Sequence, residues 1–116
     1  MARSIPLDLA MDDVFVAYAQ NGEALRREQG YPIRLVVPGC EANMWVKYLR
    51  RIMVHDVPMQ HREETSKYTE LMPDGTAQRF SWYMEANSVI TYPSPDFKMQ
   101  GPGKYFVRGL AWSGRG

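Results

Sequence analysis

The sequence predicts an α+β fold in which strands predominate. Short runs of apolar and β-branched residues recur along the chain, turn-forming residues separate them, and only a few stretches are compatible with a short helix. The clearest run extends from Ile33 to Val37, and Pro38-Gly39 closes it. We therefore expect a buried strand at residues 33–37, around which the rest of the chain is organised.

The N-terminal part is expected to contain a short helix and a β-hairpin. Ser4 can cap a helix of one or two turns, and Pro6 is tolerated in its first turn. The β-branched and aromatic residues from Val14 to Tyr18 favour a strand. Asn21-Gly22 is a strong reverse-turn signal that leads to a second short segment at Glu23 to Leu25, so these residues predict a hairpin.

The segment after the central strand is harder to assign. Residues 41–49 lack glycine and proline and could form a short helix with Met44, Tyr48 and Leu49 facing inward. Residues 51–54 are expected to form another strand, which Pro58 ends.

Residues 59–71 are polar and contain good helix formers, but they show little apolar periodicity, which favours an exposed helical turn or a structured loop. The adjacent carboxylates of Glu63 and Glu64 in this segment are expected to face solvent, because nothing near them in the sequence would raise a pKa for acid–base work. Residues 73–75, Pro-Asp-Gly, predict a turn.

The C-terminal part is expected to be β-rich. Residues 80–84 and 88–92 are strand candidates, residues 93–103 have the proline and glycine content of a linker, and residues 104–112 return to a strand pattern. Three of the residues in this last segment are aromatic.

Composition excludes several classes of protein. The chain has 116 residues, 45% hydrophobic and 23% charged, which is a globular balance that fits one ordinary domain. No apolar run approaches the roughly 20 residues that span a bilayer, and residues 1–10 lack the order of a secretory signal. A net charge of +1 gives no electrostatic case for nucleic-acid binding.

Arg34 is the first candidate binding residue, because it interrupts the apolar strand. A buried guanidinium is costly unless it leaves the sheet or pairs with an anion, and Lys47 follows a segment that could turn back toward it. Taken alone, this spacing leaves two interpretations open. The two cations could have a surface or salt-bridge role, or they could flank one anion-binding site.

The same residues carry a resemblance to a known family. The sulfite oxidase family of molybdopterin enzymes has a His-Gly-Phe/Tyr-Pro-x-Arg motif, a Val-Pro-Gly turn and, after a fixed gap, Val-Lys-Trp-Leu. This chain resembles it at that spacing in Gln29-Gly30-Tyr31-Pro32-Ile33-Arg34, Val36-Val37-Pro38-Gly39 and Val46-Lys47-Tyr48-Leu49. Residues 17–23, 62–68 and 109–114 are most similar to the molybdenum subunits of bacterial sulfur-oxidising sulfane (sulfite) dehydrogenases.

The resemblance implies a domain organisation. Family members are several times longer, so the chain would be a fragment, and the cysteine that ligates molybdenum would lie outside it. Residues 1–82 would form the C-terminal part of the molybdopterin-binding domain. Residues 83–116 would begin an incomplete immunoglobulin-like dimerisation domain, with the boundary near residues 81–86.

The resemblance also implies site residues. Arg34 matches a family position that contacts the pterin and its phosphate, and Trp45, Val46 and Lys47 match a cofactor-contacting segment. Gln29 stands where the family often has histidine, and an amide can donate a hydrogen bond there but cannot carry charge. Counted from Lys47, Tyr68 matches the family's active-site tyrosine, with Lys67 before it where sulfite oxidases often have an acid.

No metal site is expected from the residues themselves. The soft or borderline ligands are Cys40, His55 and His61, and none falls at i,i+4 or in a Cys-x-x-Cys pattern. Cys40 lies in the loop after the Pro-Gly turn, where the family has a varied residue, so it is not assigned as the molybdenum ligand.

The function that the resemblance implies is oxidation of sulfane sulfur or sulfite by a molybdopterin-dependent enzyme. The electron acceptor would be a c-type cytochrome, and the substrate a sulfur-carrier protein or a small sulfur anion. The parent would be periplasmic and would form a homo-oligomer through its C-terminal domain. This chain alone is expected to be inactive. The alternative is a stand-alone β-rich binding or structural module without catalysis.

Overall fold

The strands pair as four antiparallel two-stranded sheets in the computed structural model, which describes residues 1–114. The pairs are β1 (Phe15–Ala17) with β4 (Arg34–Val36), β2 (Ala19–Gln20) with β3 (Glu23–Ala24), β5 (Glu70–Leu71) with β6 (Ala77–Gln78), and β7 (Asn87–Tyr92) with β8 (Arg108–Trp112). The helical elements are α1 (Leu7–Asp12), the 3-10 turns η1 (Arg27–Gln29) and η2 (Ala42–Met44), and the π-helical turn η3 (Glu63–Lys67). This confirms the predicted α+β fold with mostly β structure.

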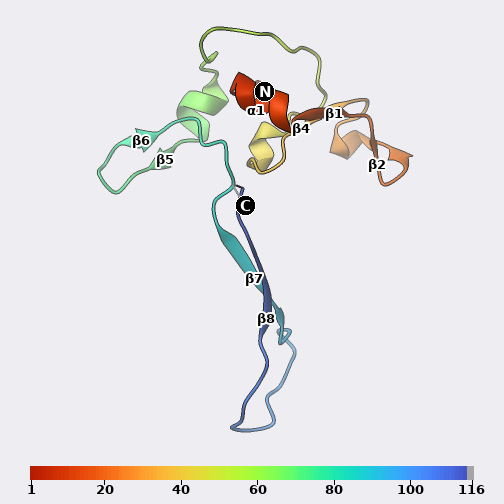
Figure 1. Cartoon of the computed structure of the whole chain (residues 1–116), viewed down its shortest axis with the longest axis vertical. Coiled ribbons are helices and arrows are strands. Elements are labelled where there is room, and N and C mark those ends of the chain that lie inside the picture. The colour runs from red at the N-terminus through yellow and green to blue at the C-terminus, as the bar shows by residue number, and fades with distance from the viewer. Residues whose placement is uncertain (115–116) are drawn as a thin grey trace.

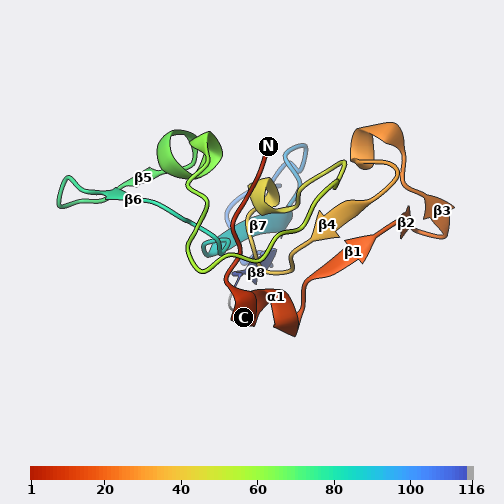
Figure 2. The same ribbon diagram turned by 90° about the horizontal axis from the view of Figure 1, so that it is seen from above.

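The predicted central strand is present as β4. It pairs with β1 in the register Phe15 to Val36 and Ala17 to Arg34. On its other side, the N–H of Leu35 donates to the Val46 carbonyl at 2.9 Å. Figure 2 shows β1 and β4 side by side, with the β2–β3 hairpin at one end and the β5–β6 hairpin extending at the other. β4 therefore places Arg34 between the segment around residue 46 and the N-terminal part of the chain.

A small apolar cluster packs against β4. Val37, Cys40 and Met44 are buried, and partly buried residues pack against them. These surrounding residues are Ile5, Leu9, Val14, Leu35, Trp45, Trp82 and Tyr83. The cluster joins α1, β4 and η2 to the segment of residues 82–83 that follows β6, so it fixes how the elements carrying the candidate site residues are placed.

The first helix does not start with the side-chain cap that the sequence predicts. α1 begins at Leu7 after Pro6, and no side chain caps it. The Ser4 hydroxyl does not cap the helix, because it donates to a carboxylate 60 residues away, at Glu64. A tertiary hydrogen bond thus replaces the expected local one.

The Asn21-Gly22 turn is confirmed. Both residues have positive φ, at 54° and 81°, the conformation that a tight two-residue hairpin turn uses. The hairpin is shorter than predicted, because its strands are β2 and β3. The strand predicted at residues 14–18 is β1, which pairs with β4, and the first strand of the hairpin is β2, which begins just after the predicted strand.

Three other expectations are wrong. The helix expected at residues 41–49 is reduced to η2, and the Tyr48 side chain is 49% exposed although it was expected to face inward. Residues 51–54 form no strand and are exposed. Residues 80–84 also form no strand, and only Tyr83 makes an isolated bridge, to Cys40.

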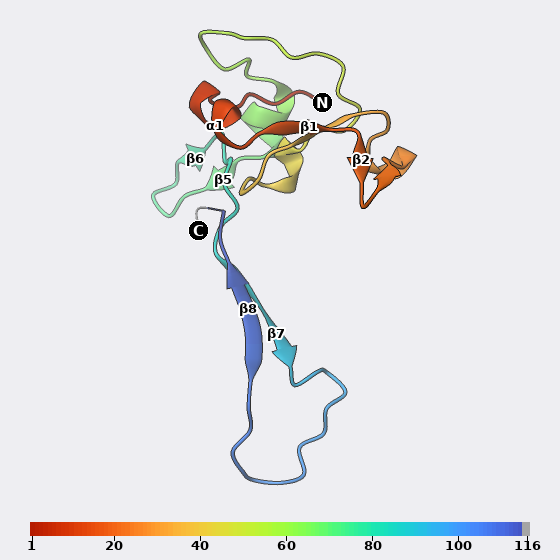
Figure 3. The same ribbon diagram turned by 45° about the vertical axis from the view of Figure 1, so that its right-hand side comes forward.

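The C-terminal hairpin projects from the rest of the molecule (Figures 1 and 3). Every residue of β7 and β8 is exposed. Its base is attached through Met84, whose N–H donates to Gly39 at 2.9 Å and whose carbonyl accepts from Gly114 at 2.8 Å. The radius of gyration is 19.1 Å, against about 13 Å for a compact domain of this length.

No helix within residues 1–114 has the length and apolarity needed to cross a membrane.

Candidate cofactor site

The η1 turn and the segment from Trp45 to Tyr48 together form the centre of the predicted site. Three side chains donate hydrogen bonds to the three successive carbonyls of this turn, and we call η1 together with Arg34, Lys47 and Tyr48 the η1 cluster. Tyr48 donates its hydroxyl to the Arg27 carbonyl at 2.8 Å, and Lys47 donates Nζ to the Glu28 carbonyl at 2.7 Å. Arg34 donates Nη1 to the Gln29 carbonyl at 3.1 Å. The structure thus brings the cations Arg34 and Lys47 to the same turn.

Arg34 also contacts Trp45. Its Nη2 is 3.5 Å from the Trp45 carbonyl oxygen, and its guanidinium carbon lies 5.7 Å from the centroid of the Trp45 ring. Cation–π contact of this kind holds a guanidinium in a defined plane. Within residues 1–114, the buried Nε of Arg34 has no hydrogen-bond partner. Arg34 is therefore oriented by carbonyls and a ring, and it retains donor capacity that the protein does not use.

Gly30 makes the close approach of Lys47 possible. It follows η1 with φ of +108°, a conformation that side-chain-bearing residues rarely adopt. A Cβ added at this position would lie 2.9 Å from the Lys47 Cβ and 3.1 Å from its Cα. The Gly-Tyr-Pro part of the motif thus has a packing role beside its turn role.

The remaining predicted cofactor residues contribute through their main chains. Gln29 is exposed and supplies the carbonyl that Arg34 binds. The Val46 carbonyl accepts from Leu35, and its N–H donates to the Met44 carbonyl at 3.0 Å. The five predicted cofactor contacts thus surround η1 and the adjoining edge of β4.

Tyr68 lies in a separate environment. It directly follows the η3 turn, which is the light green helix of Figure 1, whereas Arg34 is the first residue of β4. Two cations flank its ring: the Arg3 guanidinium carbon is 5.3 Å from the centroid and Lys67 Nζ is 5.5 Å away. Within residues 1–114, no hydrogen bond or cation–π contact links Tyr68 to Arg34 or Lys47.

Glu64 is the residue that sequence reasoning misjudged. Expected to face solvent, it is 0% exposed and accepts hydrogen bonds from Ser4 and His61. Its neighbour Glu63 is partly exposed. No local signal distinguishes these two glutamates, because the partner that buries Glu64 is 60 residues away.

Cys40 belongs to the apolar cluster. Burial raises the pKa of its thiol above the ordinary value, and the neighbouring charge of Glu41 raises it further. Its carbonyl accepts from Trp45 Nε1 at 3.2 Å. Within residues 1–114, no three His, Cys, Asp or Glu side chains gather closely enough to hold a metal ion.

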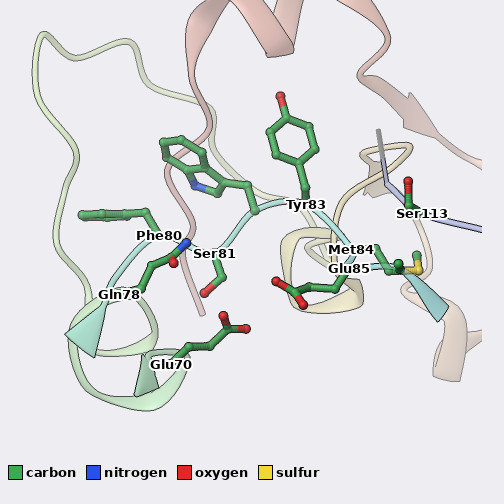
Figure 4. Close-up of a pocket in the computed structure, with 10 residues that line it drawn as sticks. Glu70, Gln78, Phe80, Ser81, Tyr83, Met84, Glu85 and Ser113 are labelled. Atoms are coloured by element: carbon green, nitrogen blue, oxygen red, sulfur yellow. The ribbon is translucent and has the colours of Figure 1, made fainter. Parts of the chain in front are cut away.

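A cavity of about 590 Å³ lies at the start of the C-terminal hairpin (Figure 4). It is lined by Glu70, Gln78, Ser113 and residues 80–86. None of the predicted cofactor or catalytic residues lines it. The cavity is therefore distinct from both the η1 cluster and the surroundings of Tyr68.

Comparison with known proteins places these features in a family. The family model for the oxidoreductase molybdopterin binding domain matches residues 1–63. The chain is 37% identical to the mitochondrial sulfite oxidase of Drosophila melanogaster over 97% of its length, and 33% identical to NADH nitrate reductase 2 of Phaseolus vulgaris over the same share. It covers only 22% and 15% of those two proteins.

A solved structure is similar along nearly the whole chain. The sulfane dehydrogenase SoxCD from Paracoccus pantotrophus is 57% identical, with a TM-score of 0.84 over 98% of this chain and 30% of that chain. The matched family model includes β4, η1 and η2 and therefore the whole η1 cluster. The chain belongs to the oxidoreductase molybdopterin binding domain family.

Proposed function

We propose that this chain is the part of a molybdenum-dependent sulfane or sulfite dehydrogenase that binds the anionic end of the molybdopterin cofactor. The observation that carries the proposal is the η1 cluster, where Arg34 and Lys47 are fixed on neighbouring carbonyls of one turn. The sulfane dehydrogenase SoxCD, at 57% identity, supports the sulfur substrate over the nitrate that plant relatives reduce.

The residues of the cluster fit a phosphate-bearing cofactor. Within residues 1–114, the buried Arg34 Nε has no hydrogen-bond partner, and Lys47 Nζ uses one of its three donors, on the Glu28 carbonyl. Charge-assisted hydrogen bonds from such donors to phosphate are among the stronger contacts in proteins. When bound, the molybdenum centre supplies the redox chemistry, and the protein supplies binding and orientation.

Tyr68 is proposed as the catalytic residue of the parent enzyme. Its phenol can donate a hydrogen bond to an anionic oxygen, and Arg3 and Lys67 beside its ring make the surroundings positive, which suits an anionic or carrier-bound sulfur substrate. Tyr68→Phe in the full-length enzyme removes only the hydroxyl. We expect kcat/KM to fall roughly ten- to a thousandfold at unchanged molybdenum content.

The domain division is proposed at residues 1–82 and 83–116. The exposed β7–β8 hairpin, attached to the rest through Met84, supports a second unit that begins near this point. Two strands alone cannot form a stable sheet domain, so the hairpin would belong to a larger sheet through which the parent forms a homo-oligomer. The parent would act in the periplasm and pass electrons to a c-type cytochrome.

The test is an assay of the full-length parent. Purified protein is supplied in turn with sulfite and with a sulfane-loaded carrier protein, and reduction of a c-type cytochrome is followed by absorbance. We expect turnover with at least one of these donors and molybdenum in the protein. A parent without molybdenum or pterin that reduces nothing would favour the alternative, a binding or structural module.

A further inference from the structure

The buried carboxylate of Glu64 holds the N-terminal segment in place. Both of its oxygens are used: Oε1 accepts from the Ser4 backbone N–H, and Oε2 accepts from the Ser4 hydroxyl at 3.1 Å and from the His61 N–H at 3.3 Å. Among the described residues it makes no ion pair. A fully buried carboxylate is costly unless hydrogen bonds compensate it, and three donors do so here.

Ser4 is bound on its other sides as well. Its carbonyl accepts from the indole N–H of Trp82 at 3.1 Å, and its hydroxyl accepts from the Met59 N–H at 3.0 Å. The Ser4 main chain is therefore fixed at both its N–H and its carbonyl. Met59 and Glu64 lie in one segment and Trp82 in another, so Ser4 joins both segments to the N-terminal one.

Arg3, the next residue along, is directed at Tyr68. Its Nη1 donates to the Glu63 carbonyl at 2.7 Å, and its Nε lies 3.1 Å from the Met44 sulfur. Its guanidinium then lies on the Tyr68 ring, 5.3 Å from the centroid. Two consecutive residues of the N-terminal segment, Arg3 and Ser4, are thus bound by two consecutive residues of η3, and the first of them contacts the Tyr68 ring.

We propose that Glu64 is a positioning residue for Tyr68: by holding Ser4, its carboxylate keeps Arg3 on the phenol ring and so fixes where the hydroxyl points. The proposal rests on the role proposed above for Tyr68. It adds a residue that does not touch substrate, and it explains why one of two adjacent glutamates is fully buried.

Glu64→Gln is the informative substitution. An amide offers one acceptor oxygen and one NH₂ group, whereas Glu64 accepts backbone N–H groups on both oxygens. In either orientation the amide NH₂ faces one of these N–H groups, so one bond is lost with little change in side-chain volume. Glu70→Gln is the matched control, because Glu70 is exposed and its side chain makes no hydrogen bond within residues 1–114.

Hydrogen exchange of the full-length, cofactor-loaded enzyme reports on the hydrogen bonds directly. In Glu64→Gln, the peptides containing the Ser4 and His61 amides should exchange at least about tenfold faster than in the wild type, since each amide depends on this carboxylate. Glu70→Gln should leave both peptides unchanged. Unchanged exchange in Glu64→Gln would overturn the proposal, because the carboxylate would then not be holding the segment.

A double-mutant cycle with Tyr68→Phe tests whether Glu64 acts through the hydroxyl. We expect Glu64→Gln alone to lower kcat/KM about tenfold, and to lower it less than about twofold when Tyr68 is already phenylalanine, because the group it positions is absent. Equal losses in both backgrounds would overturn the proposal and leave the role of Tyr68 standing. If Tyr68→Phe has no effect by itself, both the catalytic assignment and the positioning role fail.

Discussion

Replacing Gly30 with alanine tests whether the η1 cluster depends on the close approach of Lys47. The new Cβ would lie 2.9 Å from the Lys47 Cβ, and φ at this position is +108°. Positive φ costs an alanine roughly 1–2 kcal/mol, and forcing extra atoms into a packed site costs about 1–3 kcal/mol more. The local cost is therefore about 2–5 kcal/mol, and it falls on the side chain proposed to bind the cofactor.

Gly75→Ala separates the two contributions. Gly75 also has positive φ, at +83°, but nothing lies within 4 Å of the Cβ that alanine would add. It should show only the backbone cost of roughly 1–2 kcal/mol. We expect Gly30→Ala to lower both the thermal unfolding midpoint and the molybdenum content of the full-length parent, and Gly75→Ala to lower the midpoint slightly at unchanged molybdenum. Equal behaviour of the two variants would refute the packing role of Gly30.

Two further predictions concern the apolar cluster and the hairpin. Cys40→Ser should leave the molybdenum content of the parent unchanged by elemental analysis. Because the pKa of the Cys40 thiol is raised in the folded protein, alkaline pH ionises the thiol of the unfolded chain first, so the wild type should lose stability as the pH rises. The serine variant should lack this loss in thermal melts. The 116-residue chain should associate with rising concentration in sedimentation velocity, because β7 and β8 expose apolar side chains and unpaired edges. Leu110→Asp should weaken the association, and a chain that stays monomeric at high concentration would contradict this prediction.

Local chemistry was sufficient to predict some of the fold. The strand at Arg34–Val36 follows from an apolar run closed by a Pro-Gly pair, and the Asn21-Gly22 hairpin follows from residues that adopt positive φ. Residues 15–17 show the limit of this reasoning. Their strand character was evident, but they pair with β4, which lies 17 residues away in the pair Ala17 to Arg34 and 21 residues away in the pair Phe15 to Val36. No local pattern encodes that choice of partner.

The residues of the candidate site were likewise only partly predictable from the sequence. Arg34 and Lys47 could be identified from a motif, and the structure places both at η1. Glu64 could not be identified, since its burial depends on Ser4 and on Trp82 holding that serine in place. Tertiary contacts over such separations decide whether a glutamate in a polar segment is solvated or buried.

The central claim is that the η1 cluster binds molybdopterin, and the most direct measurement is the molybdenum and pterin content of the full-length parent carrying Arg34→Gln. Loss of a charge-assisted contact to phosphate costs about 1.5–3 kcal/mol, or roughly ten- to a hundredfold in affinity. Arg79→Gln is the control, because Arg79 is exposed and its side chain makes no hydrogen bond or ion pair with the other described residues. We predict that Arg34→Gln loses most of both components while remaining folded by circular dichroism and that the control retains them. Full molybdenum and pterin content in folded Arg34→Gln protein would contradict the account.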